Sequence, residues 1–275
     1  MMRLRTPLLS VLTALALSLA AATAHAQARE EGRLLTAGQV LEELRGARDQ
    51  VIPDRLLERA YGIAVIPDLT KVAFFAGGRR GHGVLVVRDK QGRFSSPVFV
   101  TMTGGSFGWQ WGVQSADLVL VFTTPKGVEG INGGKVTLGA DASVAAGPVG
   151  RQASAATDSN FKAEVYSYSR SRGVFAGLAL DGTVISIDDD ADEAFYGKPV
   201  AAGDILSGSV TSNDESARRF MAAVATSTGL QQRSASAAGT PPAADGAPAP
   251  AAPAPARNGA QSFPLADPHP GQEPK

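Results

Sequence analysis

The sequence contains no cysteine and only three histidines, and these two shortages exclude several kinds of protein chemistry. Without a thiol the chain has no disulfide framework, no thiol nucleophile and no lipoprotein anchor. His25 lies near the start of the chain and His269 near its end, which leaves His82 alone in the central part. One histidine makes neither a histidine metal cluster nor a His-dependent triad with a stable frame. We therefore expect a protein without catalytic residues, metal or cofactor.

Three short motifs begin like known ligand-binding loops and then depart from them. The acidic run from Asp188 has Glu193 where a calcium loop needs glycine, and Pro199 where that loop needs its final glutamate. Gly133-Gly134-Lys135 lacks the first glycine and the final hydroxyl residue of a phosphate loop. The glycines from Gly77 to Gly83 lie between predicted strands, so they do not open a helix as a dinucleotide-binding motif does. None of the three predicts a bound ion or nucleotide.

Long apolar runs are also missing, and the N-terminal one is too short to cross a membrane as a helix. Arg3 and Arg5 precede an apolar segment from Leu8 to Ala22, and Ala24-His25-Ala26 has the small-x-small pattern of a cleavage site. These are the three parts of a secretory signal peptide. We predict a signal peptide at residues 1–26, a mature chain that starts at Gln27, and a periplasmic or secreted location.

The charges show no excess of either sign. Removal of Arg3 and Arg5 with the signal peptide leaves 24 basic against 26 acidic residues, a net charge of −2. Nucleic-acid binding leaves a basic footprint, which this chain does not have, so no nucleic-acid partner is expected. Any attraction to anionic lipid has to come from a local group of cations.

The C-terminal segment, residues 229–275, consists mostly of alanine, proline, glycine and serine. Such a composition buries too little apolar surface to offset the entropy of ordering the chain. We predict a disordered tail there, and one folded domain at residues 27–228.

Helical patterns at both ends of that domain enclose a region of strand patterns. Thr36 and Gln39 suggest a capping box for the first helix, Pro53 suits the first turn of a second, and Ser212 with Glu215 suggests a cap for the last. Between them, alternating apolar residues and glycine-containing turns predict short strands, among them a hairpin from 173 to 187. The predicted fold class is α+β, with a largely antiparallel, glycine-rich sheet or barrel-like core flanked by N- and C-terminal helices.

The stretch from Thr103 to Val113 holds both tryptophans of the protein and four glycines. On one strand Phe107, Trp109, Trp111 and Val113 would share a face, and glycines would leave the other face nearly bare. Two interpretations remain open: a tightly packed sheet core, or an amphipathic contact with a ligand or membrane.

The glycine-rich segment from Gly77 to Gly83 holds Arg79, Arg80 and His82. We interpret it as a turn in which backbone and guanidinium groups could approach a phosphate closely. A solvated hairpin turn is the competing interpretation, because arginines are mostly exposed in any protein.

An ordered set of segments resembles the SYLF domain family. The segments are Tyr61–Pro67, Gly81–Val87, Phe94–Phe99, the glycine–tryptophan stretch, Gly147–Arg151, Tyr166–Gly177, Asp181-Gly182 and Tyr196-Gly197. The resemblance spans roughly Leu34 to Val224, and the order of the segments is more specific than any one of them. Phe94 is a departure, because the family commonly has tryptophan there, and this puts only local packing in doubt.

The resemblance implies an exported, non-enzymatic lipid-binding domain that recognises anionic phospholipid headgroups at the cell envelope. Phospholipid or a membrane surface is then the expected partner. Candidate lipid-binding residues are cations on turns together with the two tryptophans: Arg79, Arg80, His82, Trp109, Trp111, Lys126 and Arg151. The alternatives are an envelope scaffold that binds proteins and a hydrolase with an unrecognised carboxylate pair.

Overall fold

The structure of the protein is a computed structural model that describes eight segments of the chain. These are residues 25–43, 52–73, 76–89, 91–107, 112–148, 162–171, 174–176 and 180–230. Trp109, Trp111 and Arg151 lie outside the described residues, as do residues 1–24 of the predicted signal peptide and 231–275 of the predicted tail. Among the helices that are described, none has the length and apolar character needed to cross a membrane.

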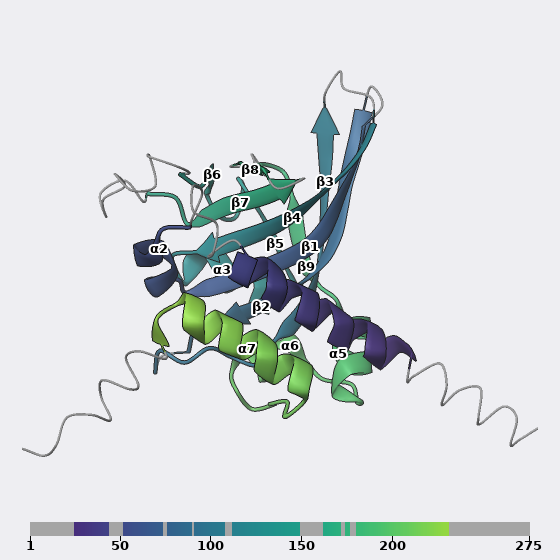
Figure 1. The fold of residues 1–275 in the computed structure, drawn as a ribbon, viewed down its shortest axis with the longest axis vertical. Helices are drawn as coiled ribbons and strands as arrows, with labels where there is room; N and C mark the ends of the chain where they lie inside the picture. Colours follow the sequence, from purple (N-terminus) through teal and green to yellow (C-terminus); the bar gives the residue numbers. More distant parts are fainter. Residues whose placement is uncertain are drawn as a thin grey trace, which may run out of the picture. The chain divides into compact units, whose positions relative to one another are not determined.

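A nine-stranded sheet forms the centre of the described domain (Figure 1). Its strands run in the order β5-β9-β3-β2-β1-β4-β7-β6, and β8 pairs with β7. All pairs are antiparallel except β6 with β7. The strands are β1 (Gly62–Ala73), β2 (Ala76–Val87), β3 (Val98–Phe107), β4 (Gly112–Phe122), β5 (Lys135–Thr137), β6 (Val144–Ala146), β7 (Val165–Ser171), β8 (Val174–Ala176) and β9 (Val184–Ile187). The predicted α+β class with a largely antiparallel sheet and flanking helices is confirmed.

Helices cover the sheet from both sides. The labelled helices are α2 (Asp54–Glu58), α3 (Lys126–Asn132), α5 (Asp189–Tyr196), α6 (Ala202–Leu206) and α7 (Glu215–Ser227). A further helix at residues 25–43 precedes them and is the dark purple helix of Figure 1. It lies beside α7, where Gly38 brings the two backbones close: a Cβ at Gly38 would be 3.7 Å from the Cα of Phe220.

Two of the predicted helix caps are wrong. Thr36 lies inside the helix of residues 25–43, and its hydroxyl donates to the carbonyl of Gly32, one turn earlier, at 2.9 Å. A threonine inside a helix can bond its own backbone in this way, so the sequence pattern resembles a cap that is not there. In α7 the N-cap is Asp214, whose carboxylate accepts from the Ser216 N–H, instead of Ser212.

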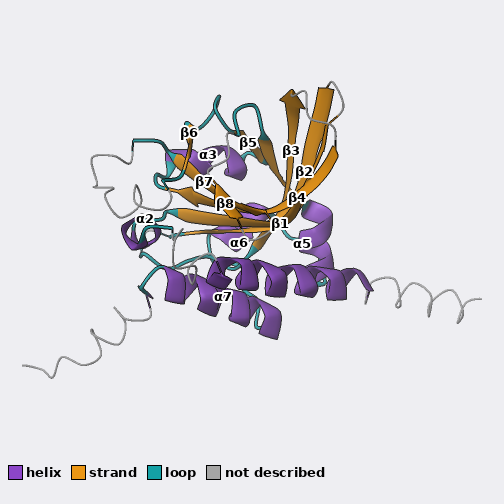
Figure 2. Cartoon of the chain, turned by 45° about the horizontal axis from the view of Figure 1, so that its top comes forward, coloured by secondary structure: helices purple, strands orange, loops and turns teal. Residues whose placement is uncertain are grey.

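Two apolar layers hold these elements together, one on each face of the sheet. The first layer joins the helix of residues 25–43, α2, α5 and α7 to alternate residues of the central strands, such as Val65, Val84 and Val86. The second layer uses the intervening residues, such as Ile66 and Leu85, and includes α3. Figure 2 shows α3 on the opposite side of the sheet from α7. Burial on both faces explains why the central strands have apolar runs.

The glycine-rich segment from Gly77 to Gly83 is part of strand β2, and the prediction of a turn there is wrong. The segment pairs with β1 on one side and β3 on the other. Two of its glycines are needed for space: a Cβ at Gly83 would lie 2.4 Å from the carbonyl oxygen of Val65, and one at Gly81 would lie 2.6 Å from the side chain of Ile66. Close approach of β1 therefore selects glycine inside the strand.

Two other predicted strand arrangements also differ from the structure. The stretch from Thr103 to Val113 is divided between β3, which ends at Phe107, and β4, which begins at Gly112, and the two are not neighbours in the sheet. The predicted hairpin from 173 to 187 does not form, because β8 pairs with β7 and β9 pairs with β3 and β5. Local alternation indicates a strand but does not select its partner.

Candidate functional site: a cationic cleft

A cleft of about 470 Å³ lies between the helix of residues 25–43 and strands β1 and β2. Three arginines, one histidine and two threonines supply its donors, and one aspartate supplies its negative charge. The lining residues are Arg29, Arg33, Thr36, Pro67, Asp68, Thr70, Arg80, Gly81 and His82. A volume of this size is within the usual range for a small-molecule site.

The alternation of β2 explains why the cleft forms where it does. Val86 and Val84 point toward the helical layer and are fully buried there. The next two residues on the same face are His82 and Arg80, because side chains alternate along a strand. The apolar layer under the helix therefore gives way to a polar cleft along one continuous strand face.

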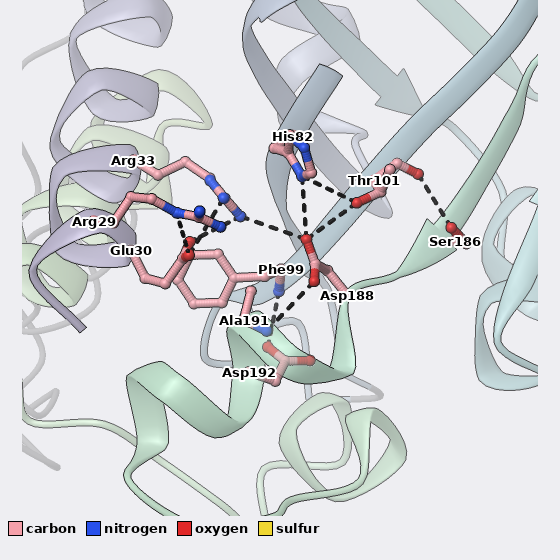
Figure 3. A network of polar contacts seen from close by, with 10 residues as sticks. All are labelled: Arg29, Glu30, Arg33, His82, Phe99, Thr101, Ser186, Asp188, Ala191 and Asp192. Atoms are coloured by element: carbon pink, nitrogen blue, oxygen red, sulfur yellow. Dashed lines mark hydrogen bonds and ion pairs between the residues drawn. The ribbon is translucent and has the colours of Figure 1, made fainter. Parts of the chain in front are cut away.

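Asp188 is the centre of a polar network behind the cleft (Figure 3). Its Oδ2 atom is 3.2 Å from Nδ1 of His82 and accepts a hydrogen bond of 3.1 Å from the hydroxyl of Thr101. Asp188 is also the N-cap of α5, where its carboxylate accepts from the backbone N–H of Ala191. With Nδ1 held in this way, Nε2 is the ring nitrogen of His82 that is left for a ligand, and the side chain is 40% exposed.

The helix of residues 25–43 supplies the other side of the network. Arg33 pairs with the buried carboxylate of Glu30 at 2.8 Å and approaches Asp188 at 3.8 Å, and its guanidinium lies over the ring of Phe99. Arg29 approaches Glu30 at 3.2 Å and remains largely exposed. Desolvation by burial lowers the pKa of Arg33, against the attraction of Glu30 and Asp188. Arg33 therefore anchors the helix, whereas Arg29 is available to solvent.

The carboxylates beneath the cleft differ in their protonation. Desolvation by burial raises the pKa of Asp188, but hydrogen bonds from His82, Thr101 and the Ala191 N–H, together with the charge of Arg33, lower it more, so the net shift is downward. The pKa of Asp192 is raised to about 7, mainly by burial and also by the nearby Asp189, Asp188 and Glu30, against the hydrogen bond that its carboxylate accepts from the Phe99 N–H. Near neutral pH, Asp188 is thus charged and Asp192 titrates.

The cleft includes two of the candidate residues named from the sequence, Arg80 and His82. Arg79 is on the opposite face of β2, where its guanidinium donates to the carbonyl oxygen of Gly105 at 3.3 Å. Burial lowers the pKa of Arg79. The predicted pairing of Arg79 with Arg80 on one phosphate is therefore wrong, because adjacent residues of a strand face opposite ways.

Lys126 does not line the cleft. It begins α3 on the other side of the sheet, and it pairs with Glu164 at 3.1 Å. The remaining candidates, Trp109, Trp111 and Arg151, lie outside the described residues. The described strand ends do show that Phe107 pairs with Ala76, and Gly112 with Ala73.

Sequence reasoning did not find Arg29, Arg33, Asp68 or Asp188 as members of this region. The spacing of Arg29 and Arg33 was an available signal, because residues four apart lie on one face of a helix. It was missed because the helix was predicted to begin at Thr36. No local pattern joins Asp188 to His82, which lie 106 residues apart in the sequence.

The cleft offers donors suited to an anion. Arg80 is exposed and has no ion-pair partner among the residues that the structure describes. Guanidinium groups match phosphate and carboxylate oxygens in geometry, and Thr70 adds a hydroxyl beside Arg80. The described residues contain no group of three or more acidic, histidine or cysteine side chains that could hold a metal ion.

The fold and the cleft define an α+β domain with a candidate anion-binding site under its first helix. Residues 103–227 match the family Ysc84, described as "Las17-binding protein actin regulator". The chain therefore carries a domain of the Ysc84/SYLF family, as the resemblance of its sequence predicts. The matched range starts in β3, so the helix of residues 25–43 and strands β1 and β2 precede it.

Similar proteins include yeast and mammalian members of the family. LAS seventeen-binding protein 3 of Saccharomyces cerevisiae is 41% identical over 165 residues, which is 59% of this chain and 36% of the yeast protein. The human SH3 domain-containing YSC84-like protein 1 is 33% identical over 165 residues, which is 60% of this chain and 48% of the human protein. The chain thus spans from about a third to a half of these relatives.

Proposed function

We propose that this chain is an exported, non-enzymatic lipid-binding domain that recognises anionic phospholipid headgroups at the cell envelope. The observation that supports this most directly is the cleft, where Arg29, Arg33, Arg80 and His82 converge from a helix and a strand. The mature chain has a slightly negative net charge, so this convergence is a local feature instead of a consequence of composition. A phosphate in the cleft would accept from Arg80 and Arg29, which are more exposed than Arg33.

The family description supports a second candidate, an envelope scaffold that binds proteins. The family is described by Las17 binding and actin regulation, and the yeast relative is named for binding Las17. An exported protein does not meet actin, so the partner would be another envelope protein. The two candidates make different predictions for purified lipid vesicles.

Replacing both Arg29 and Arg80 with alanine should weaken binding to anionic vesicles in a flotation assay. Each cation near a membrane surface contributes about 1 kcal/mol, so the double variant should lose roughly tenfold or more in affinity, most clearly at low salt. The matched control is Arg55→Ala with Arg218→Ala, because these exposed arginines do not line the cleft. Equal losses in the two double variants would show that only total charge matters.

Wild-type protein that does not float with any anionic vesicle would contradict lipid binding and favour the scaffold. Export has its own test, since N-terminal sequencing of envelope material should begin at Gln27 or within a residue or two. An intact Met1 on the functional protein would contradict the predicted localisation.

A further inference from the structure

We infer that Asp68 makes the cleft selective for headgroups in which the phosphate carries a substituent with a hydrogen-bond donor, a hydroxyl or an ammonium group. This inference rests on the proposed function and specifies its ligand class. Asp68 is the one acid that lines the cleft within the described part of the chain. A cleft that bound bare phosphate alone would gain nothing from a carboxylate beside its arginines.

The backbone of Asp68 is held in an unusual conformation. Its φ angle is 53°, and Asp68 is the one non-glycine residue with positive φ in the described segments. The pairing of β1 shifts register here toward both neighbours, after Val65 on the β2 side and after Ile66 on the β4 side. A bulge of this kind re-aims a side chain, and strained residues of this kind cluster at functional sites.

Neighbouring groups fix the position of Asp68. Its backbone N–H donates to Asp117 at 3.2 Å, and its carbonyl accepts from the hydroxyl of Thr70 at 3.2 Å. Its Oδ1 atom accepts a 3.3 Å hydrogen bond from the hydroxyl of Ser115. No described residue forms an ion pair with Asp68, although three arginines line the same cleft. One carboxylate oxygen, Oδ2, is therefore available to a ligand.

The strand register places Thr70 between the proposed phosphate site at Arg80 and this carboxylate. Thr70 pairs with Arg80 of β2 on one side and with Ser115 of β4 on the other, so the three form a row across the sheet. Directly paired residues have Cβ atoms about 5 Å apart. Arg80 is thus at one end of the row, and Asp68, bonded to Ser115, is at the other end. We therefore place the phosphate at Arg80 and its substituent at Asp68, since both residues line the same cleft.

The chemistry of an unpaired carboxylate determines what it selects. It only accepts hydrogen bonds, so a phosphate oxygen placed next to it would be repelled. A hydroxyl or ammonium group on the substituent would donate to it, and hydrogen bonds to charged groups are the stronger ones. The quaternary ammonium of a choline headgroup is positively charged but has no N–H to donate. A choline headgroup can therefore attract the carboxylate by charge but cannot form a hydrogen bond with it.

The test is Asp68→Asn. Its binding is compared with that of the wild type on three kinds of phosphatidylcholine vesicle, which contain the same fraction of phosphatidylglycerol, phosphatidylethanolamine or phosphatidic acid. Asparagine tolerates positive φ and can still accept from Ser115, so the fold should be kept. The wild type should prefer phosphatidylglycerol over phosphatidic acid. The variant should lose roughly fivefold or more of that preference, with weaker binding to phosphatidylglycerol and equal or tighter binding to phosphatidic acid.

Asp204→Asn is the matched control, because it removes the same charge from an exposed position on α6 outside the cleft. It should leave the preference unchanged. Phosphatidylethanolamine shows whether an ammonium donor serves as well as a hydroxyl. Titration with soluble glycerophosphoglycerol, followed by NMR, distinguishes a free phosphodiester from a lipid surface as the source of the group.

Weaker binding to phosphatidylglycerol together with equal or tighter binding to phosphatidic acid would support the role of Asp68. If Asp68→Asn alters binding to both lipids by the same factor, or to neither, Asp68 is not a selector, and lipid binding itself still stands. If wild-type protein binds none of the vesicles and does not respond to glycerophosphoglycerol, the proposed function fails together with this inference.

Discussion

The two faces of strand β2 differ in what they contribute to the protein. One face presents Arg80 and His82 to the cleft, whereas the other presents Gly81 and Gly83 to the side chains and backbone of β1. The glycine face leaves no room for a Cβ, and the cationic face opens to solvent. The comparison shows that one short segment both permits close strand packing and supplies cations to the cleft. The alternation of side chains along the strand places these two roles on opposite faces.

The largest effect is expected from a change on the glycine face. Gly83→Ala should lower the free energy of unfolding by about 2–4 kcal/mol, because the new Cβ would lie 2.4 Å from the carbonyl oxygen of Val65. Chemical denaturation measures the loss. Gly78→Ala is the control in the same strand, since the nearest atom to its Cβ is 3.9 Å away. Equal stability of the two variants would contradict the close packing of β1 on β2.

An effect of intermediate size is expected from the buried acid behind the cationic face. The pKa of Asp192 is raised to about 7, so its contribution to stability is complete below the unfolded pKa near 4 and is lost as the pH rises through 7. Wild-type protein should therefore lose about 1–3 kcal/mol of unfolding free energy from this group between pH 5 and pH 8. Asp192→Asn should remove that decline.

Denaturation curves at several pH values measure the effect. Asp190→Asn is the matched control, because Asp190 is exposed on the same helix and should leave the decline in place. An Asp192→Asn protein that still loses the same stability over this range would mean that another group titrates.

The smallest effects are expected when the arginine on either face of β2 is replaced by alanine. Arg80→Ala should reduce the affinity for anionic vesicles by about 1 kcal/mol and leave stability nearly unchanged, because its guanidinium is exposed. Arg79→Ala should do the reverse, losing about 1 kcal/mol of stability with the hydrogen bond to Gly105 while vesicle binding changes little. Flotation measures vesicle binding and thermal unfolding measures stability, and both are applied to both variants. Identical behaviour of the two would remove the distinction between the faces.

The local patterns in the sequence predicted much of the fold. Pro53 precedes the short helix α2, and helices lie at both ends of the domain with strands between them. These features depend on spacing within a few residues, so the sequence alone can predict them. The α+β class followed from the apolar residues, which have helical spacing at the ends of the domain and alternate as in strands in its middle.

The candidate site was predicted only in part. Arg80 and His82 were named, but Arg29 and Arg33 were not, because the first helix was taken to start at Thr36. The glycines around Arg80 were interpreted as a turn, since the sequence does not distinguish a glycine needed for backbone freedom from one needed for space. The close approach of β1 that requires these glycines is a contact between strands.

The sequence by itself determined the alternation along the strands, the helical character of both ends of the domain and the start of the short helix α2, because each depends on sterics and hydrogen bonds between near neighbours. The tertiary structure alone decided that a carboxylate at Asp188 would hold His82, that the helix of residues 25–43 would lie over β2, and that Asp68 would turn into the cleft. Each of these depends on strand partners and packing across long separations, which local patterns do not specify.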